Sequence, residues 1–590
     1  MTAPDPPEST LPIGAALRRV FAKGYRLTDL RTDLLAGTVV GIVAVPLSMA
    51  LAIAVGVPPQ HGLYTAIVAG AVVALLGGCK FQVTGPTAAF VVILAPIASK
   101  HGLAGLLSAG FMAGLMLIAM GMARLGNLIR YIPHPVTTGF TTGIATVIAT
   151  LQLKDVFGLR AGTMPDPYIG KIAALWGARS TASARELGVA AVTLALLLLI
   201  PRVVKRIPAP LIAIGAVSLG SALLHRAYPD FAVATIGSRF HTIVDGVEIA
   251  GIPSTLPSPS MPWGVRGVGF GLVQDLLPAA FAIAMLGAIE SLLSAVIADG
   301  MTDTKHDPNS ELVALGIGNV VAPIFGGIAA TGALARTATN IRTGARSPFA
   351  AVTHAVVVLL AMLVLAPGVS YVPMASLAAL LLLVAWNMSE IHGFIGVVKI
   401  APKSDVFVLV TCFGLTVFFD MVIAVSVGFV LAAILFMRRM SELTESHFEF
   451  DASREGGRSS SLPDGVMVYE INGPLFFGAA QKALATLRAT AGDAFHVLVI
   501  RLERVPVIDA TGLVALENAI SSVLRAKKKV VLAGPLPKPH RIFDKAELEA
   551  KHQGLFIRAN AQTAMEFAVS LVDAMPSSLR KTTANVVQGG

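Results

Sequence analysis

Long apolar runs, separated by short turns, fill most of the chain. From Leu34 to about Phe436 the runs follow one another, and most could cross roughly 30 Å of hydrocarbon as helices. The pattern predicts about twelve to fourteen membrane-spanning helices, although several runs are short for a span. The clearest runs cover residues 34–55, 63–77, 104–122, 135–150, 187–200, 211–224, 276–298, 352–366, 377–384, 406–419 and 421–436.

The composition also indicates a membrane protein. Of 590 residues, 55% are hydrophobic and 14% are charged, which excludes an ordinary soluble protein. The net charge of +10 could indicate nucleic acid, but the basic residues cluster beside apolar runs, as orientation signals do. We therefore expect no nucleic-acid partner and an even number of spans, with both termini in the cytoplasm. Cys79 and Cys412 lie in or beside apolar runs and predict no disulfide.

The pattern changes at both ends of the apolar region. Residues 1–33 predict a cytoplasmic N-terminal tail with an amphipathic basic segment, and residues 34–439 a transmembrane transport domain. Residues 440–461 are polar and mixed in charge, which predicts a linker. Over residues 462–575 strand-like alternation takes turns with helical periodicity, which predicts a small α/β domain, and residues 576–590 are expected to be a disordered tail.

A first break interrupts the apolar region at residues 81–90, FQVTGPTAAF. The sequence predicts a short extended segment and then a helix that starts at Pro86, with Thr84 and Gly85 supplying the cap and the turn. Such a helix would begin at membrane depth, where irregular backbone is tolerated only if protein or a watery cavity receives it. Its free N–H groups and positive dipole end make an anion site.

A second break, FGGIAATGALAR, covers residues 325–336 and repeats the pattern around Thr331 and Gly332. Paired broken helices in two halves of a membrane protein indicate a transporter's binding site at the midplane. The alternative is that both segments are ordinary loops, but an exposed loop would usually carry more charge.

Glu290 is the strongest candidate for chemistry. It lies in the apolar run LLPAAFAIAMLGAIESLLSAVIA, where a carboxylate is costly unless it faces a cavity or a partner, and Ser294 follows one turn later. The hypothesis is a proton-coupling group or a cation ligand; the alternative is a structural glutamate bonded to the second break. Arg336 could lend positive charge to an anion, or it could be an ion-paired or cytoplasmic arginine. Asp299, Asp303 and Asp307 indicate helix caps rather than a metal site.

Several segments together resemble the sulfate permease (SulP) anion transporters, in particular a bacterial member that takes up C4-dicarboxylates. They are GPTAAF at 85–90, LGAIESLL at 286–293, DGMTDTKHDPNSEL at 299–312, ARTATNIRTGA at 335–345 and VAWNMSE at 384–390. The resemblance implies an α-helical polytopic protein with fourteen transmembrane segments in a 7+7 inverted repeat, divided into core and gate domains. It also implies a bacterial inner membrane location.

The resemblance assigns the site residue by residue. Substrate would lie between the third and tenth segments and the first span, which Pro46 kinks. Glu290 and Ser294 would hold the coupling ion, a proton rather than sodium, and no other cofactor or metal is implied. The implied substrate-binding residues are Ser48, Met49, Gly85, Pro86, Thr87, Ala88, Phe90, Ala333, Ala335 and Arg336.

The C-terminal domain resembles a STAS domain. VIDATGL at residues 507–513 matches the strand-to-helix turn that accepts phosphate in related domains, with Asp509 and Thr511 at the turn. Ala510 replaces the usual acceptor serine, which argues against phosphorylation there. The resemblance further implies a homodimer and a possible cytoplasmic partner of this domain.

The leading hypothesis is proton-coupled uptake of C4-dicarboxylates (succinate, fumarate, aspartate) by an elevator-like alternating-access mechanism. Leu47 stands where many members of the family have Gln or Glu after the proline, which disfavours sulfate relative to those members and keeps the dicarboxylate hypothesis open. The alternative within the family is bicarbonate or sulfate transport. A membrane-anchored STAS signalling scaffold is the alternative from another class. The sequence has no nucleophile–base set, phosphate loop or metal-ligand spacing, so an enzyme is not expected.

Overall fold

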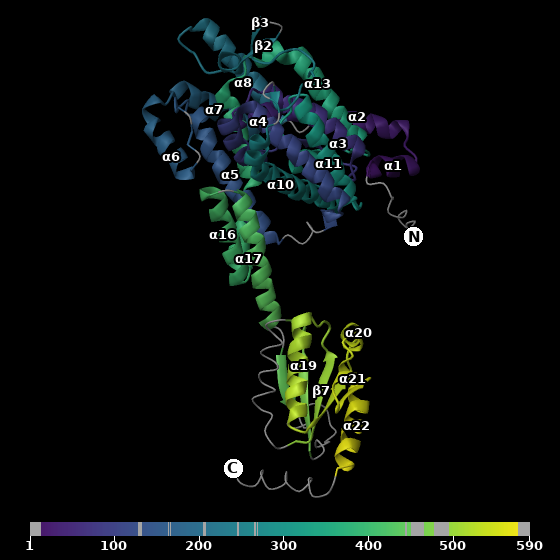
Figure 1. Cartoon of the computed structure of the whole chain (residues 1–590). Coiled ribbons are helices and arrows are strands. Elements are labelled where there is room, and N and C mark those ends of the chain that lie inside the picture. Colours follow the sequence, from purple (N-terminus) through teal and green to yellow (C-terminus); the bar gives the residue numbers. More distant parts are fainter. Residues whose placement is uncertain are drawn as a thin grey trace. The chain divides into compact units, whose positions relative to one another are not determined.

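The computed structural model divides into two compact units, residues 1–430 and 431–590. Figure 1 shows the order of the helices and strands. The described residues are 13–575 without 128–132, 163, 166, 204–207, 245–246, 265–266, 268, 420, 443–444, 450–464 and 477–494. Residues 1–12 of the predicted N-terminal segment 1–33, the predicted tail 576–590 and most of the predicted linker lie outside this set.

The first unit is built from helices. In chain order they are α1 (Ala15–Ala22), α2 (Leu27–Val55), α3 (Gln60–Leu76), α4 (Ala88–Met122), α5 (His134–Val156), α6 (Tyr168–Gly177), α7 (Ala184–Val203), α8 (Ala209–Ala227), α9 (Ile236–Arg239), α10 (Phe270–Thr302), α11 (Pro308–Ile324), α12 (Leu334–Arg342), α13 (Phe349–Val369), α14 (Met374–Met388), α15 (Ile391–Ile400), α16 (Lys403–Phe418) and α17 (Met421–Glu442). Short strands join them: β1 (Thr84–Gly85), β2 (His241–Val244), β3 (Val247–Ala250) and β4 (Thr331–Gly332).

Within the described residues, eight helical segments are long and apolar enough to cross a membrane, and α3 is a shorter apolar helix. Gly102 (φ 65°, ψ −168°) interrupts α4, which is therefore two helices. With α4 counted as two, and the short helices α1, α6, α9 and α15 set aside, two runs of seven helices remain: α2 to α8 and α10 to α17. This is the expected seven-plus-seven arrangement. The helices of these two runs that do not meet the length and hydropathy expected of a span are broken or short helices such as α12.

The two runs of helices do not form separate bundles, because helices of each run pack against helices of the other. Helix α2 packs against α13, while α4 packs against α10 and α11. Helix α5 packs against α14 and α16, and α14 also contacts α7. Each group therefore mixes both halves, as a core and a gate would. At the α4–α11 crossing a Cβ on Gly114 would lie 2.7 Å from the Gly316 carbonyl oxygen, and the reverse distance is also 2.7 Å, so glycine is required on both helices.

The first span starts earlier than expected. Helix α2 begins at Leu27, and Asp33, placed by the sequence in the N-terminal tail, is fully buried within it. Its carboxylate accepts hydrogen bonds from the N–H groups of Arg346 and Ser347 before α13 and from the Tyr25 hydroxyl. Burial, with the nearby Asp33 carboxylate, raises the pKa of Tyr25 to about 12. The segment before residue 34 is therefore tied to the membrane unit.

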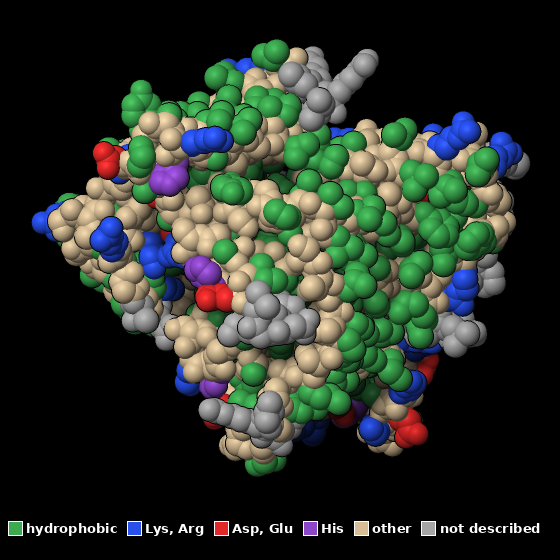
Figure 2. All heavy atoms as spheres, turned by 90° about the horizontal axis from the view of Figure 1, so that it is seen from above, with side chains coloured by type: hydrophobic (Ala, Val, Ile, Leu, Met, Phe, Trp, Pro, Cys, Tyr) green, Lys and Arg blue, Asp and Glu red, His purple; other side chains and the backbone are tan. Residues whose placement is uncertain are grey.

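Large hydrophobic side chains are exposed on many of these helices, for example Leu219 on α8, Val364 on α13 and Ile400 on α15. Figure 2 shows hydrophobic side chains spread over one face of the molecule, with most Lys and Arg side chains toward its edges. Such a surface suits lipid as solvent.

The second unit is an α/β domain. Its sheet has the order β5 (Glu445–Glu449), β6 (Val466–Asn472), β7 (Val497–Arg504), β8 (Lys529–Ala533) and β9 (Leu555–Arg558); only the β5–β6 pair is antiparallel. Alternate residues of the strands enter different cores, because strand side chains point to opposite faces: Ile500 lies in the core with α19 (Ala510–Arg525), and Val499 in the core with α22 (Ala561–Asp573). Two further helices are α20 (Pro537–Lys545) and α21 (Leu548–Lys551).

This arrangement confirms the predicted α/β domain. It also places β5 inside the expected linker 440–461, so that segment contributes an edge strand to the sheet. The strand lacks a long apolar run, which is why composition marked it as linker.

Candidate functional site

The two predicted breaks meet. Strands β1 and β4 pair antiparallel, with Thr84 opposite Gly332 and Gly85 opposite Thr331. The same Thr-Gly pair from each half thus faces its counterpart across a local two-fold axis. The prediction that Thr84 and Gly85 cap a helix starting at Pro86 is wrong, because both residues are used in this pairing. Helix α4 starts at Ala88 with Thr87 as N-cap.

The backbone that leads into the first break, residues 78–83, is irregular and is satisfied by protein groups. We call it the first lead-in. Its Gly78 and Cys79 N–H groups donate to the Glu311 carboxylate at 2.8 and 2.9 Å. Helix α12 holds its other end, since the side chain of Asn340 donates to the Phe81 carbonyl at 2.9 Å. These contacts meet the requirement that irregular backbone at membrane depth be paired.

The second lead-in, residues 325–330, is paired differently. The Asn319 amide donates to the Ala330 carbonyl and accepts from the Ala330 N–H, at 2.9 and 2.8 Å. From α3, the Thr65 hydroxyl donates to the Ile328 carbonyl at 2.9 Å, and a ring nitrogen of His61 lies 2.6 Å from the Gly326 carbonyl oxygen. No charged side chain takes part among these contacts of the described residues.

Arg336 extends from the start of α12 toward the first break. Its side chain is 3% exposed, and its Nη2 donates to the Pro86 carbonyl. Its Nε and Nη1 have no hydrogen-bond partner within the described chain. A Cβ on Gly85 would lie 2.5 Å from Nη1, so the guanidinium lies directly against the glycine of β1. Arg336 is therefore buried against the first break, and a buried cation with spare donors can bind an anion.

Glu290 of α10 contacts the start of α4. Its Oε2 accepts a hydrogen bond of 2.9 Å from the Thr87 hydroxyl, and its side chain remains partly exposed. The Glu290 side chain therefore bonds to Thr87 of the first break, and not to the second break as the alternative had it. Ser294 donates to the Thr337 hydroxyl of α12 at 3.2 Å. The carboxylate from α10 thus joins the N-cap of α4.

The remaining predicted substrate-binding residues differ in burial. Ser48 and Met49 are buried on α2, and the Ser48 hydroxyl has no partner within the described residues. Ala88, Phe90 and Ala333 are buried, whereas Ala335 is exposed at the start of α12. The geometry brings Pro86, Thr87, Glu290 and Arg336 together through hydrogen bonds or close approach.

Three residues of this region were not predicted from the sequence: Gln82, Ser291 and Glu311. All are buried, and the Gln82 amide bridges the Ser291 hydroxyl at 2.6 Å and the Glu311 carboxylate at 2.7 Å. The signal was present: a polar residue inside the first break, a serine beside Glu290 and a glutamate at the start of an apolar helix.

Further features bear on the predictions about helix caps, metal binding, disulfides and the site. Asp307 caps α11 by accepting from the Asn309 and Ser310 N–H groups, as expected, and no cluster of three or more metal-ligating side chains occurs in the described parts of the chain. Both cysteines are free and buried. An apolar cavity of about 480 Å³ lies between α5, α7 and α14, and none of the predicted site residues lines it.

The strand-to-helix turn of the C-terminal domain has the predicted form. Asp509 is the N-cap of α19 and accepts from the Gly512 N–H at 2.6 Å. Ala510 and Thr511 are exposed in the first turn.

Paired broken helices from two halves, meeting beside a buried cation, are the arrangement of a secondary transporter. A murine anion transporter, solute carrier 26 family member A9 in the inward-facing state, has the same fold: the TM-score is 0.81 at 19% identity, over 94% of each chain. The model of the sulfate permease family matches residues 30–412, and that of the STAS domain matches residues 461–564. The chain belongs to the sulfate permease family and is a secondary anion transporter, not an enzyme.

Two relatives are similar to this chain over most of its length. A putative sulfate transporter of Bacillus subtilis, YvdB, is 40% identical over 89% of this chain and 95% of its own length. The bicarbonate transporter BicA of Picosynechococcus is 28% identical over 88% of this chain and 91% of its own. The transmembrane domain of a cyanobacterial BicA superposes with a TM-score of 0.58 at 28% identity, covering 68% of this chain and 98% of that domain.

Proposed function

We propose that this protein imports a small inorganic oxyanion, sulfate or bicarbonate, and couples the uptake to protons. The observation that carries the proposal is the buried Arg336 guanidinium, whose Nε and Nη1 have no partner within the described residues, beside the paired breaks. The relatives reported above are named for sulfate and bicarbonate, so they favour the alternative of the sequence analysis over its leading hypothesis of a C4-dicarboxylate.

The anion would bind where α4 and α12 begin. The first N–H groups of each helix lack intrahelical partners, and both dipoles present their positive ends there. Arg336 adds a full positive charge, and the Thr87 hydroxyl already bridges to Glu290 at 2.9 Å. A proton on Glu290 would remove the negative charge that otherwise opposes an anion in the site. Movement of the core against the gate then exposes the site to the other side.

Uptake into proteoliposomes tests the substrate. Labelled sulfate, bicarbonate and succinate are supplied separately to the purified full chain, with an inward proton gradient, an inward sodium gradient or neither. We expect sulfate or bicarbonate to accumulate with the proton gradient. Accumulation of succinate alone would restore the dicarboxylate hypothesis, and a sodium requirement would remove the proton from the mechanism.

A Glu290→Gln variant tests the coupling. The amide can keep the contact with Thr87 but cannot exchange a proton, so we expect gradient-driven accumulation to be lost while counterflow exchange persists. Glu186→Gln is a matched control, because Glu186 is a buried carboxylate on α7 that accepts from the Ala234 N–H at 2.6 Å. Unchanged accumulation in Glu290→Gln would exclude Glu290 as the proton carrier.

The homodimer, a cytoplasmic partner of the STAS domain and an inner membrane location with both termini in the cytoplasm stay predictions.

A further inference from the structure

Glu311 is a buried carboxylate of the membrane unit that the proposed transport cycle does not use. It lies in the first turn of α11 and is 1% exposed. Its Oε2 accepts from the Gly78 and Cys79 N–H groups, and its Oε1 accepts from the Gln82 amide at 2.7 Å. Each oxygen therefore bonds a different part of the first lead-in.

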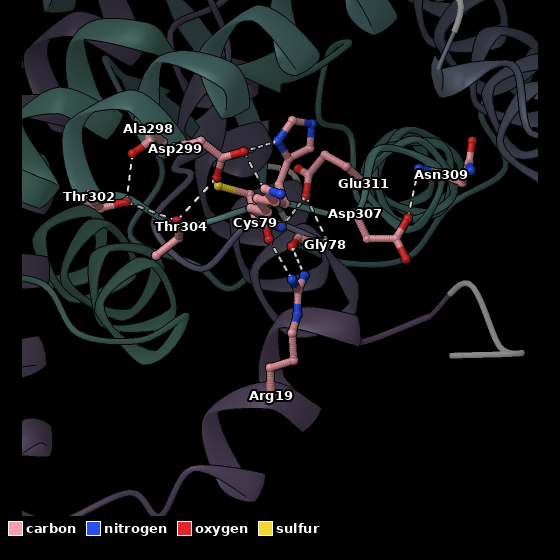
Figure 3. Close-up of polar contacts among 12 residues, drawn as sticks. Arg19, Gly78, Cys79, Ala298, Asp299, Thr302, Thr304, Asp307, Asn309 and Glu311 are labelled. Atoms are coloured by element: carbon pink, nitrogen blue, oxygen red, sulfur yellow. Dashed lines mark hydrogen bonds and ion pairs between the residues drawn. The ribbon is translucent and has the colours of Figure 1, made fainter. Parts of the chain in front are cut away.

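Gly78 is held from both sides, as Figure 3 shows. While its N–H donates to Glu311, its carbonyl accepts from Arg19 of α1 at 2.7 Å, and Arg19 also donates to the Lys305 carbonyl. A Cβ at this position would lie 2.0 Å from the Asp307 carbonyl oxygen, so only glycine allows the approach. The lead-in is thereby fixed against the start of α11.

The contact continues to the proposed site through Gln82. The Gln82 amide donates to both Glu311 and the Ser291 hydroxyl, and that hydroxyl also accepts from the Gly332 N–H of β4 at 3.3 Å. Ser291 directly follows Glu290 on α10. One chain of hydrogen bonds thus joins α11, the first lead-in, the segment of α10 that carries Glu290, and the second break.

We propose that Glu311 is a positioning residue for transport: through Gln82 and Ser291 it sets the place of both breaks relative to Glu290, without exchanging protons itself. This inference rests on the proposed function. It predicts that hydrogen-bonding geometry at residue 311 matters more than its charge, because the residue acts by holding backbone and amide donors.

The Gln82 amide makes this prediction testable. Its Oε1 has no partner among the described residues. In a Glu311→Gln variant the new carbonyl can accept from Gly78 and Cys79 while the new NH₂ group faces Gln82. The Gln82 amide can then turn over, so that its oxygen accepts from residue 311 and from the Ser291 hydroxyl. Glu311→Ala offers no such replacement.

Cys79 provides a reporter that does not depend on transport. It is buried, and its N–H is one of the groups Glu311 holds. In a Cys412→Ser background it is the sole thiol of the chain. The rate at which a maleimide labels Cys79 then measures opening of the first lead-in, and uptake of labelled sulfate and bicarbonate measures transport on the same protein.

We expect Glu311→Gln to keep Cys79 protected and the apparent KM within about threefold of the parent, because the glutamine can preserve the contacts with Gly78, Cys79 and Gln82. Glu311→Ala should label at least about tenfold faster and raise KM at least about tenfold, since buried donors lose their acceptor. Gln82→Ala, which removes only the bridge, should raise KM and leave Cys79 protected; it also serves if Glu311→Ala does not fold. Glu186→Ala should leave Cys79 labelling unchanged.

Two results would overturn the inference. The first is a Glu311→Gln variant that transports as poorly as Glu311→Ala while Cys79 stays protected, because the charge would then carry the role. The second is normal KM in both Glu311→Ala and Gln82→Ala. If the parent transports none of the three anions, the proposed function fails by itself, and Cys79 labelling still reports whether Glu311 holds the lead-in.

Discussion

The two breaks share one backbone arrangement and differ in what holds them. Charged side chains hold the first: Glu311 binds the start of its lead-in, and Arg336 binds the Pro86 carbonyl at its end. Neutral groups hold the second, chiefly the Asn319 amide and the Thr65 hydroxyl. The repeat therefore conserves shape across the two halves while charge gathers at one of them.

This difference indicates which break mainly serves transport and which mainly serves stability. A buried charge is costly to keep, and at the first break the Arg336 charge is the one that the proposed anion site uses. Neutral hydrogen bonds satisfy backbone at lower cost. We therefore expect changes at the first break to alter transport most, and changes at the second break to alter stability most.

The largest effect is expected at Arg336. Arg336→Gln removes the buried positive charge, and we expect apparent affinity for the transported anion to fall by at least about a hundredfold, the scale of two strong charge-assisted hydrogen bonds. Arg336→Lys keeps the charge but loses the planar fork and should lose about tenfold. Initial uptake rates over a range of anion concentrations provide the measurement. Equal KM in the parent and the Gln variant would remove Arg336 from the site.

The glycines of β1 and β4 give the next effect. Gly85→Ala would bring a Cβ to 2.5 Å from Arg336 Nη1, and Gly332→Ala would bring one to 2.4 Å from Gln82 Nε2. We expect the first to raise KM about tenfold by displacing the cation, since an offset of this size breaks hydrogen-bond geometry. The second should act through Gln82 and raise KM less. Gly220→Ala on α8 meets nothing within 4 Å and is the control.

Equal KM increases in Gly85→Ala and Gly332→Ala would contradict the asymmetry of the two breaks. An increase in Gly220→Ala would show that the assay reports general damage rather than the site.

The sequence predicted the parts of this region that depend on local signals. The Thr-Gly pairs marked both breaks, and an isolated carboxylate in an apolar run marked Glu290. The seven-plus-seven arrangement came from the family resemblance rather than from counting, because short helices such as α12 fail any length criterion. Hydrophobic alternation was enough for β6 and β7 but not for β5, an edge strand without an apolar run.

What the sequence could not predict depends on contacts between distant residues. The pairing of β1 with β4 joins positions about 250 residues apart, so no local pattern encodes it. Glu311 was not singled out from the sequence, and only its contact with Gly78, 233 positions away, gives it a role. Arg336 stayed ambiguous for the same reason: its burial is decided by the other half of the chain.

Asn319 tests the expectation that changes at the second break mainly alter stability. Asn319→Ala removes the two hydrogen bonds to Ala330 and leaves buried backbone groups unpaired, so we expect the free energy of unfolding to fall by about 2–4 kcal/mol. The apparent KM of molecules that remain folded should stay within about threefold, because no charge is lost. Thermal unfolding in detergent and uptake on the same preparation measure both quantities. A large KM increase at unchanged unfolding temperature would mean that the second break also binds substrate.

The smallest effect is expected at Thr65. Thr65→Val keeps the shape of the side chain and removes the hydroxyl that donates to the Ile328 carbonyl at 2.9 Å. One neutral hydrogen bond is worth about 1 kcal/mol, so unfolding temperature should fall slightly while KM stays unchanged. Thr65→Ser, which retains the hydroxyl, should restore most of the lost stability. If the Val variant instead impairs uptake as strongly as Gly85→Ala, the second lead-in takes a direct part in transport, and the division between a functional and a structural break does not hold.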